Sequence, residues 1–309
     1  MSLHGLVGIT IGVPNVEQAA AYYQEFGLER IPLAVAGQAA FATVDGGEQL
    51  RLVQSNRRRL VELRIGADDP DDLDRIEHSL DELGEAAHRD QRAITTVEAA
   101  TGVSVVVAIA PRIRQAPAEA VAYNGPGSVS RPNERSAAIL REGPVKPRRL
   151  GHVVLGSVDQ ERSQRFFRDG LGFKLSDTVP GLAAFLRCSP DHHNVLVQQA
   201  PVPFLHHSAW EVDDVDEVGR GATRMLEADP SRHVWGLGRH HVGSNFFWYL
   251  RDPAGNFTEY YSDLDCIVDD ALWRPEVWEG ARGLFNWGPP PPPSFLEPED
   301  LADLMLQSH

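Results

Sequence analysis

The two halves of this chain repeat the same order of segments. One copy, LVGITIGVPNVEQAAAYYQEFGL, begins at Leu6, and the other, LGHVVLGSVDQERSQRFFRDGLGF, begins at Leu150. Each opens with an apolar stretch, passes a glycine, and continues into an amphipathic stretch that carries two adjacent aromatic residues and ends at a glycine. This pattern predicts a strand followed by a helix at the start of each half. A chain built from such copies must fold as repeated units, which restricts its architecture more than its composition does.

The repeat continues beyond the first helix of each half. LVELRIGADDPDDLDRIEHSLDELG from Leu60 and HSAWEVDDVDEVGRGATRMLEA from His207 each predict a strand, an acidic turn and a helix. AATGVSVVVAI from Ala99 and DPAGNFTEYYS from Asp252 each predict a turn that leads into a strand. The unit is therefore one strand, one helix and further strands, present twice in each half. We predict an α+β protein with four βαβββ modules that pair into two half-open barrels.

The segment between the halves and the end of the chain differ in composition from the modules. Residues 124–149 are rich in glycine, proline and charged residues and are predicted to form a linker. This places an N-terminal domain at 1–123, a C-terminal domain at 150–270 and a proline-rich tail at 271–309. Five consecutive prolines, 289–293, predict a polyproline II conformation, not a helix. We expect the tail to lie on the surface, with covering of a pocket as the alternative.

The composition argues against several classes of protein. With a formal net charge of −15, this 309-residue chain lacks the basic surface that a nucleic-acid partner requires. It contains no apolar run long enough to span a membrane, and its first residues lack the features of a signal peptide. The two cysteines, Cys188 and Cys266, provide neither a disulfide framework nor a thiolate metal site. We therefore expect a cytoplasmic protein with no nucleic-acid or membrane partner.

Histidines gather in the second half of the chain, and their placement is the main functional signal. Most of the 12 histidines lie between residues 152 and 241. These are His152, His192, His193, His206, His207, His233, His240 and His241. Such a gathering indicates metal binding or acid–base chemistry.

Comparison of the two copies separates candidate ligands from residues that the fold needs. His152 lies on the first strand of the second half, and Gly8 is at the matching place in the first half. Glu259 lies on the last strand, and its counterpart is Val106. The fold therefore does not require an ionisable residue at either place.

His207 completes a set of two histidines and one glutamate on three strands. It starts a strand whose counterpart begins near Leu60, so we expect aliphatic residues or glycine at all three matching positions. A single histidine or glutamate on a strand is usually a core or surface side chain. Together, two histidines and one carboxylate form the facial set that suits non-haem Fe(II), and Mn(II) is also accommodated. The C-terminal half is therefore predicted to carry the metal.

The stretch GRHHVGSNFFWYLRDPAGNFTEYYSD, from Gly238 to Asp263, resembles the signature of the type I extradiol ring-cleaving dioxygenases of the vicinal oxygen chelate superfamily. In that family a histidine is followed nine positions later by a tyrosine, then by Asp-Pro-x-Gly and the metal-binding glutamate. His240, Tyr249 and Glu259 fill these places. Trp248 departs from the usual aliphatic residue or phenylalanine, which bears on the shape of the pocket.

The resemblance also implies roles for the histidines further upstream. It implies His152, in GHVVL, as the first metal-binding histidine. Of the pair in FLHHSAWEV, adjacent strand residues face opposite ways, so only one reaches the metal, and the resemblance favours His207 over His206. The second histidine of DHHNVLV, His193, is implied as the acid–base residue.

The activity that the resemblance implies is extradiol cleavage of a catechol with O2 at a mononuclear Fe(II) centre. Both oxygen atoms would enter the product, and the ring bond beside the diol would break. Tyr249 and His240 would hydrogen-bond the substrate, and Val154 and Trp248 would contact it. Val154 and Trp235 suggest an apolar pocket for a neutral, hydrophobic or bulky catechol. Relatives are commonly multimers, so a homo-oligomer is expected.

Two other functions fit the same modules. One is a metal-dependent lyase or isomerase of the glyoxalase kind, which would not ordinarily carry the run from His240 to Glu259 or the acid–base His193. The other is a non-catalytic binding protein of the antibiotic-sequestering type, which needs no metal and is typically about half as long. The metal content of the protein and its oxygen uptake with a catechol distinguish these functions from ring cleavage.

Overall fold

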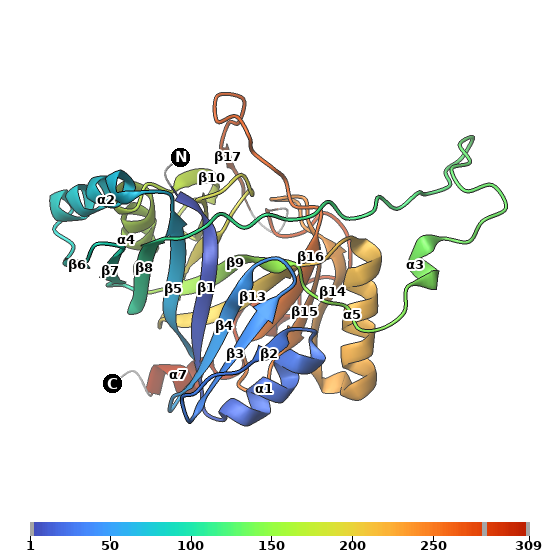
Figure 1. The fold of residues 1–309 in the computed structure, drawn as a ribbon, viewed down its shortest axis with the longest axis horizontal. Coiled ribbons are helices and arrows are strands. Elements are labelled where there is room, and N and C mark those ends of the chain that lie inside the picture. The colour runs from blue at the N-terminus through green and yellow to red at the C-terminus, as the bar shows by residue number, and fades with distance from the viewer. Residues whose placement is uncertain (1–2, 280–282, 307–309) are drawn as a thin grey trace.

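The computed structural model describes residues 3–279 and 283–306 of the chain. Residues 1–2 of the predicted N-terminal domain, and residues 280–282 and 307–309 of the predicted tail, lie outside the described residues. Two large sheets make up the body of the protein (Figure 1). One sheet belongs to the first half of the chain and the other to the second half.

The first half folds as two βαβββ modules. The first module contains β1 (Leu3–Val13), α1 (Val16–Glu25), β2 (Glu29–Ile31), β3 (Gln38–Thr43) and β4 (Gly47–Gln54). The second contains β5 (Arg59–Ala67), α2 (Pro70–Glu82), β6 (Ala87–Arg89), β7 (Ala93–Glu98) and β8 (Val103–Ile109). Their strands form one sheet in the order β2-β3-β4-β1-β5-β8-β7-β6, in which β1 and β5 join the modules.

The second half repeats this arrangement. Its first module contains β9 (Arg149–Ser157), α4 (Gln160–Arg165) with a π-helical turn at Phe166–Gly170, β10 (Lys174–Val179), β11 (Ala183–Arg187) and β12 (Val195–Gln199). Its second contains β13 (Phe204–Glu211), α5 (Val215–Ala228), a 3-10 turn at Pro230–Arg232, β14 (His233–Arg239), β15 (Phe246–Arg251) and β16 (Phe257–Ser262). The sheet order is β14-β15-β16-β13-β9-β12-β11-β10-β17. The predicted α+β class and the four modules are confirmed, and both sheets are open along the strands described.

Each module turns from its first strand into its helix at an aspartate or asparagine. Asp69 and Asp214 accept hydrogen bonds from the backbone N–H of Asp72 and Glu217 at the starts of α2 and α5. Asn15 and Asp159 cap α1 and α4 in the same way. These side chains satisfy backbone donors that have no partner inside the helix, and this explains why the acidic turns of the repeat start helices.

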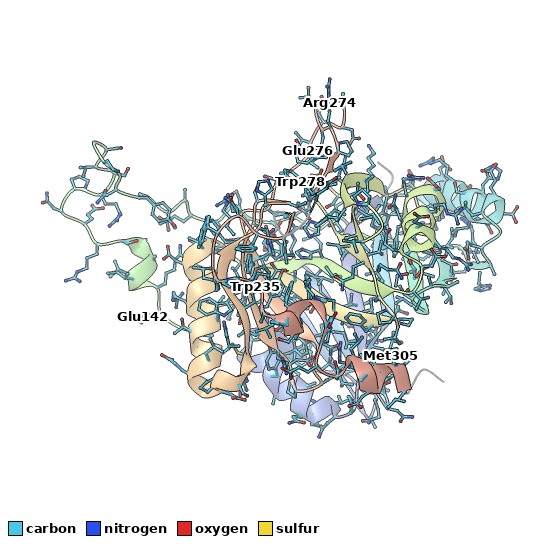
Figure 2. All side chains as sticks on the ribbon, turned by 180° about the vertical axis from the view of Figure 1, so that it is seen from behind. Glu142, Trp235, Arg274, Glu276, Trp278 and Met305 are labelled. Atoms are coloured by element: carbon cyan, nitrogen blue, oxygen red, sulfur yellow. The ribbon has the colours of Figure 1, made fainter. Side chains whose placement is uncertain are left out.

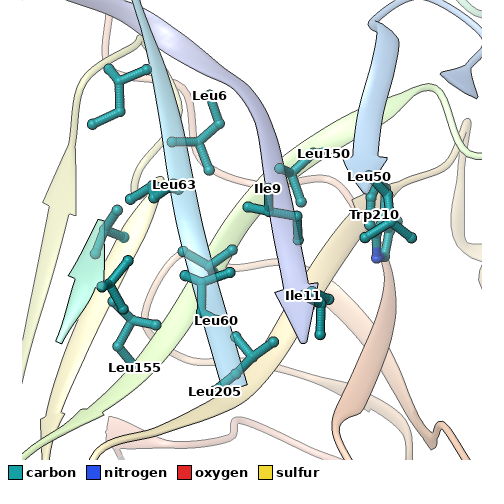
Figure 3. Close-up of a cluster of buried hydrophobic side chains, with 14 of the residues drawn as sticks. Leu6, Ile9, Ile11, Leu50, Leu60, Leu63, Leu150, Leu155, Leu205 and Trp210 are labelled. Carbon is teal, nitrogen blue, oxygen red and sulfur yellow. The ribbon is translucent and has the colours of Figure 1, made fainter. Parts of the chain in front are cut away.

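The two halves share one hydrophobic core. In the sheet centres, β1 contacts β9 and β5 contacts β13. Figure 3 shows leucine, isoleucine and tryptophan side chains meeting between these strands. The labelled residues are Leu6, Ile9, Ile11, Leu50, Leu60, Leu63, Leu150, Leu155, Leu205 and Trp210. The ring of Phe26 after α1 also stacks on that of Tyr260 in β16, with centroids 3.9 Å apart. The first half thus packs against the second sheet and supports it.

The segment between the halves and the segment after β16 project from this body. Residues 110–148, including the short helix α3 (Ala137–Leu140), run out to one side and return near α5 (Figure 1). After β16, a loop with Arg274 near its tip extends from the body, and Glu276 and Trp278 lie at its base (Figure 2). This loop contains β17 (Glu276–Val277), which pairs with β10 and adds a strand to the second sheet.

The rest of the tail returns to the body, so the expectation that it lies on the surface is wrong. It forms α6 (Pro293–Leu296) and α7 (Leu301–Leu306). Phe295 is only 3% exposed, and Asp300 forms an ion pair with the buried Arg58, with an N–O distance of 2.6 Å. The proline run also differs in part from its prediction, because Pro293 begins α6. Proline is accepted at the first position of a helix, where its missing N–H needs no partner.

No helix among the residues described is both long and apolar enough to cross a membrane.

Candidate metal centre

Strand register brings the three predicted ligands together. β13 lies between β9 and β16, and Ala209 of β13 pairs with His152 on one side and with Glu259 on the other. His207 is two residues before Ala209 and therefore shares its face of the strand. The small side chain of Ala209 leaves the space above it to the three larger ones. The three side chains converge because of their positions in the sheet.

The donor atoms of these residues form a compact triangle. His152 Nε2 lies 3.1 Å from Glu259 Oε2, and His207 Nε2 lies 3.4 Å from the same oxygen. The two Nε2 atoms are 3.4 Å apart. Ligand atoms that each lie about 2.1 Å from one ion are separated by roughly these distances. All three side chains are buried, so a cation held there would be shielded from bulk water.

The charge of Glu259 also calls for a cation. Its side chain has no solvent exposure, and its ion-pair partners within the described chain are histidines only. Asn245 donates from Nδ2 to the second carboxylate oxygen at 3.1 Å, which orients the carboxylate but does not neutralise it. A buried carboxylate is costly unless it is paired with positive charge. The residues therefore fit a divalent metal ion bound by two nitrogens and one oxygen.

The matching place in the first half is filled differently. There Arg64 of β5 pairs with Gly8 on β1 and with Val106 on β8, as Ala209 pairs with His152 and Glu259. This register makes Glu62, two residues before Arg64, the counterpart of His207. The prediction that all three counterparts are aliphatic or glycine is therefore wrong at this position, because the sequence comparison placed the strand only approximately.

One ring nitrogen of His207 faces the triangle, and the other faces the neighbouring histidine. Its Nδ1 lies 2.8 Å from Nδ1 of His206, and Nε2 of His206 lies 2.5 Å from the backbone oxygen of Phe295. Burial lowers the pKa of His206 to about 4, so this ring is neutral at pH 7. Because the carbonyl can only accept, His206 carries its hydrogen on Nε2 and accepts on Nδ1. His207 then carries its hydrogen on Nδ1, and its Nε2 lone pair points to the triangle.

His193 stands beside the triangle in a similar arrangement. Its ring centroid is 4.2 Å from that of His152, and its Nδ1 is 3.1 Å from Nδ1 of His192. Nε2 of His192 lies 3.2 Å from a carboxylate oxygen of Asp177. Burial, reinforced by the rings of His152 and His192, holds the pKa of His193 well below its usual value. A neutral His193 is a proton acceptor next to the triangle.

His240 and Tyr249 form a hydrogen-bonded pair on the other side. Nδ1 of His240 donates to the backbone oxygen of Leu284 at 2.6 Å, so its Nε2 accepts the hydrogen bond from the Tyr249 hydroxyl at 2.7 Å. Burial lowers the pKa of His240 and raises that of Tyr249, so both groups are neutral at pH 7. The pair offers one polar hydrogen-bonding position within a mostly apolar wall.

These residues line one cavity of about 70 Å³. Its apolar walls are Val154, Phe185, Leu196, Val242, Leu284, Phe295 and Leu296. An aromatic ring such as benzene occupies a cavity of about 150 Å³, so a ring-sized ligand requires the rim to move. Leu296, 56% exposed, is the rim residue nearest to solvent. The tail thus covers the pocket, which was the alternative to its lying on the surface.

Trp248 does not belong to this wall. It precedes Tyr249 on β15, and adjacent strand residues face opposite sides of the sheet. Its side chain packs against the core, and its Nε1 donates to Nδ1 of His233 at 3.1 Å. The expectation that Trp248 contacts a substrate is therefore corrected, whereas Val154 lies in the lining.

Sequence reasoning missed the groups that hold the site in place. Asn245 comes from a loop, Asp177 from the strand β10, and the backbone oxygens of Leu284 and Phe295 from the tail. The two histidine pairs in the sequence could have indicated such groups, because one histidine of each pair contacts the other and orients its ring.

Comparisons with known proteins agree with this geometry. Residues 149–260 match the model of the Glyoxalase/Bleomycin resistance protein/Dioxygenase superfamily, and this part of the chain belongs to that superfamily. The sequence is similar to metapyrocatechase 2 of Cupriavidus necator, with 40% identity over 154 residues that cover 49% of this chain and 48% of that protein. It is also 30% identical to the iron-dependent extradiol dioxygenase of Rhodococcus jostii (strain RHA1) over 154 residues, 45% of this chain and 50% of that protein.

The chain spans about half the length of the curated relatives that it matches. The fold is shared over a longer stretch. The Mn(II)-bound glyoxalase from Novosphingobium aromaticivorans superposes with a TM-score of 0.76 and 24% identity, covering 94% of this chain and 93% of that one. The predicted superfamily is thus confirmed in the second half, and its fold is confirmed over nearly the whole chain.

Proposed function

We propose that this protein cleaves an uncharged catechol by extradiol ring opening with O2, with Fe(II) as the metal and Mn(II) as an accepted substitute. One observation carries the proposal. His152 and His207 line one cavity together with His193, His240 and Tyr249, and Glu259 completes the triangle of donor atoms with the two histidines. The names of the relatives, metapyrocatechase 2 and iron-dependent extradiol dioxygenase, support the same reaction class.

His152, His207 and Glu259 would hold the metal, which when bound supplies chelation of the two diol oxygens and a path for electrons from the ring to O2. The protein supplies the rest. Tyr249 and His240 present a neutral hydrogen-bonding pair toward a substrate oxygen. His193, held neutral by burial, accepts a diol proton and returns it as the product forms. The apolar walls exclude water from these steps.

The lining of the cavity also supports an uncharged substrate. No lysine or arginine lines it within the described parts of the chain. A carboxylate on the substrate would therefore lose its hydration without gaining a positive partner, which is costly. An unsubstituted or alkyl-substituted catechol carries no such penalty.

The alternative is a lyase of the glyoxalase kind, because a Mn(II)-bound glyoxalase has the same fold. The arrangement around the triangle favours ring cleavage. It provides a proton acceptor at His193 on one side and the His240–Tyr249 pair on the other. A two-oxygen chelate that must react with O2 needs both a base and a hydrogen-bonding partner for the oxygen that stays bound.

The two halves provide a matched test. The anaerobically purified protein is loaded with Fe(II) and given catechol and air, and oxygen uptake and the yellow ring-opened product are measured. We expect one O2 per product and loss of both metal and uptake in Glu259→Gln. The counterpart variant Glu62→Gln should keep both. Bound metal without oxygen uptake by the wild type would support the lyase, and protein that binds no metal would support a binding module.

We also propose that the protein forms a homo-oligomer and works in the cytoplasm. The projecting segments support the first point, since Ile139 and Leu140 of the linker, and Val268 and Leu272 after β16, are more than half exposed. Such side chains are common at contacts between subunits. Two unpaired cysteines suit a reducing compartment. Light scattering on the purified protein tests the assembly, and a monomer at micromolar concentration would contradict it.

A further inference from the structure

Each of the three functional histidines outside His152 uses one ring nitrogen inside the site and the other outside it. His207 faces the triangle with Nε2, and His193 lines the cavity; each contacts another histidine with Nδ1. His240 faces Tyr249 with Nε2 and a backbone oxygen with Nδ1. A neutral imidazole has one N–H and one lone pair, so the outer contact decides which nitrogen is available inside.

The outer contact of His207 ends on the tail. The backbone oxygen of Phe295 fixes the hydrogen of His206 on Nε2, and the bare Nδ1 of His206 then accepts from Nδ1 of His207. If this carbonyl moved away, His206 could carry its hydrogen on Nδ1 instead. The hydrogen of His207 would then shift to Nε2, the nitrogen that points to the triangle and must be bare to bind a metal.

The outer contact of His193 also depends on the tail, through Asp177. The first oxygen of Asp177 accepts the backbone N–H of Glu276 at 2.7 Å. The second accepts from His192 at 3.2 Å and from Nε1 of Trp278 at 3.3 Å. The tail therefore fixes the carboxylate that orients His192, and His192 in turn contacts His193.

The third contact is direct. Nδ1 of His240 donates to the backbone oxygen of Leu284, which lies in the tail between β17 and α6. Phe295, Leu284, Glu276 and Trp278 all lie in residues 276–279 and 283–295 of the tail. Their four contacts lead to three histidines of the same site, directly at His240 and through His206, Asp177 and His192 at the other two. β17 pairing and ordinary docking of a tail would not require the contacts of Phe295 and Leu284 to end on histidines.

We propose that tail residues 276–279 and 283–295 are part of the active site, because they set the ring tautomers of His207, His193 and His240. His206, His192 and Asp177 are positioning residues in this scheme, since they act through another side chain. The inference rests on the metal site of the proposed function and adds the requirement that the tail be docked for that site to be formed.

The anchoring of the tail is consistent with this role. The Phe295 ring lies against His206, Trp235 and Tyr249, with centroid distances of 4.7–4.8 Å (Trp235 is labelled in Figure 2). Further along, Asp300 binds Arg58, and Arg58 also donates to the backbone oxygen of Leu205 at 2.7 Å. Leu205 immediately precedes His206. The same interactions that dock the tail therefore hold the strand that carries His206 and His207.

The test uses the full-length chain and measures metal binding and ring tautomers, which do not depend on turnover. His206→Phe removes both hydrogen bonds, whereas His206→Gln retains one donor and one acceptor. We expect His206→Phe to weaken Mn(II) binding about 10- to 100-fold, as loss of a partner behind a ligand does. His206→Gln should recover most of the affinity. Phe295→Ala should weaken binding as well, and Leu306→Ala, an exposed position of the same tail, should not.

Nitrogen NMR of the histidine-labelled protein without metal reports the tautomers directly, because a bound metal would itself fix the hydrogen of His207 on Nδ1. In the wild type we expect His207, His193 and His240 each to carry hydrogen on Nδ1, and Phe295→Ala should give mixed tautomers at His207. Unchanged tautomers together with unchanged Mn(II) affinity in His206→Phe and Phe295→Ala would overturn the inference. Each variant is compared by thermal unfolding without metal, so that a general loss of fold is recognised. If the wild type shows these properties but cleaves no diol, the proposed reaction fails while the inference stands.

Discussion

Gly8 and Arg64 share one space in the first half of the protein. A Cβ atom on Gly8 would lie 2.6 Å from Nη2 of Arg64, closer than real contacts allow. Gly8 is the counterpart of His152. The guanidinium group of Arg64 therefore lies at the place in the first half that corresponds to the His152 side chain in the second half. The first half thus keeps the strands of the metal site and fills the place of the site with a guanidinium group.

Gly8→His should therefore lower stability without creating a second metal site. The imidazole must displace Arg64, and overpacking of this kind costs about 1–3 kcal/mol. Val106 still occupies the counterpart of Glu259, so no carboxylate is present there. Denaturant unfolding should show the loss, and adding Arg64→Ala should restore part of it. Metal analysis should still give one ion per chain, and a second ion would contradict this account.

Asn245→Leu should weaken metal binding while the fold is retained. Asn245 donates to the Glu259 oxygen that faces away from His152. Without this donor the carboxylate can rotate, and loss of such a partner typically costs 10- to 100-fold in metal affinity. Competition with a chelator measures the change. Affinity within about two-fold of the wild type would show that the strand alone orients Glu259.

Stability should fall in acid because of a partly buried ion pair between Asp191 and Arg149 beside the site. Asp191 binds both terminal nitrogens of Arg149, at 2.6 and 2.9 Å. Burial alone would raise the pKa of Asp191, but Arg149, Ser189 and Asn194 hold it below its ordinary value. A carboxylate with a depressed folded-state pKa stabilises the fold above its unfolded pKa of about 3.9 and loses this contribution as the pH falls through the folded value.

Asp191→Asn should therefore cost about 1–3 kcal/mol at pH 7, because Arg149 loses one charged partner and keeps its ion pair with Glu211. Its unfolding free energy should also change less than that of the wild type below pH about 4. Denaturant unfolding at a series of pH values checks both points. Parallel pH curves for the two proteins would rule out Asp191 as a source of the acid sensitivity.

The repeat in the sequence was enough to predict the modules and the convergence of His152, His207 and Glu259. Both follow from strand order and alternation, which are local properties of a repeated chain. The exact counterpart of His207 could not be obtained this way. A shift of one residue in the register moves a side chain to the other face, and the bulges in β1 and β9 pairings are not visible in the sequence.

The prediction that the tail lies on the surface was also wrong, and for a different reason. A proline run predicts its own conformation but not what it packs against. Phe295 becomes a wall of the cavity through contacts with residues as distant in sequence as His206. Trp248 was misjudged because its neighbour Tyr249 matched a motif, although the two side chains point to opposite faces.

The uncharged cavity leads to a prediction about substrate charge. We expect the wild type to cleave catechol or an alkylcatechol with a kcat/KM at least about 100-fold higher than that for a catechol bearing a carboxylate, since an unpaired buried charge costs several kcal/mol. Leu196 lines the cavity from β12, and Leu196→Arg would place a cation there. This variant should shift the ratio of the two kcat/KM values toward the carboxylated substrate by about tenfold or more, the gain expected from a charge-assisted hydrogen bond.

Leu182→Arg, at an exposed turn between β10 and β11, adds the same charge outside the cavity and should leave the ratio unchanged. Equal shifts in both variants would mean that overall charge, not the lining of the cavity, governs the choice of substrate.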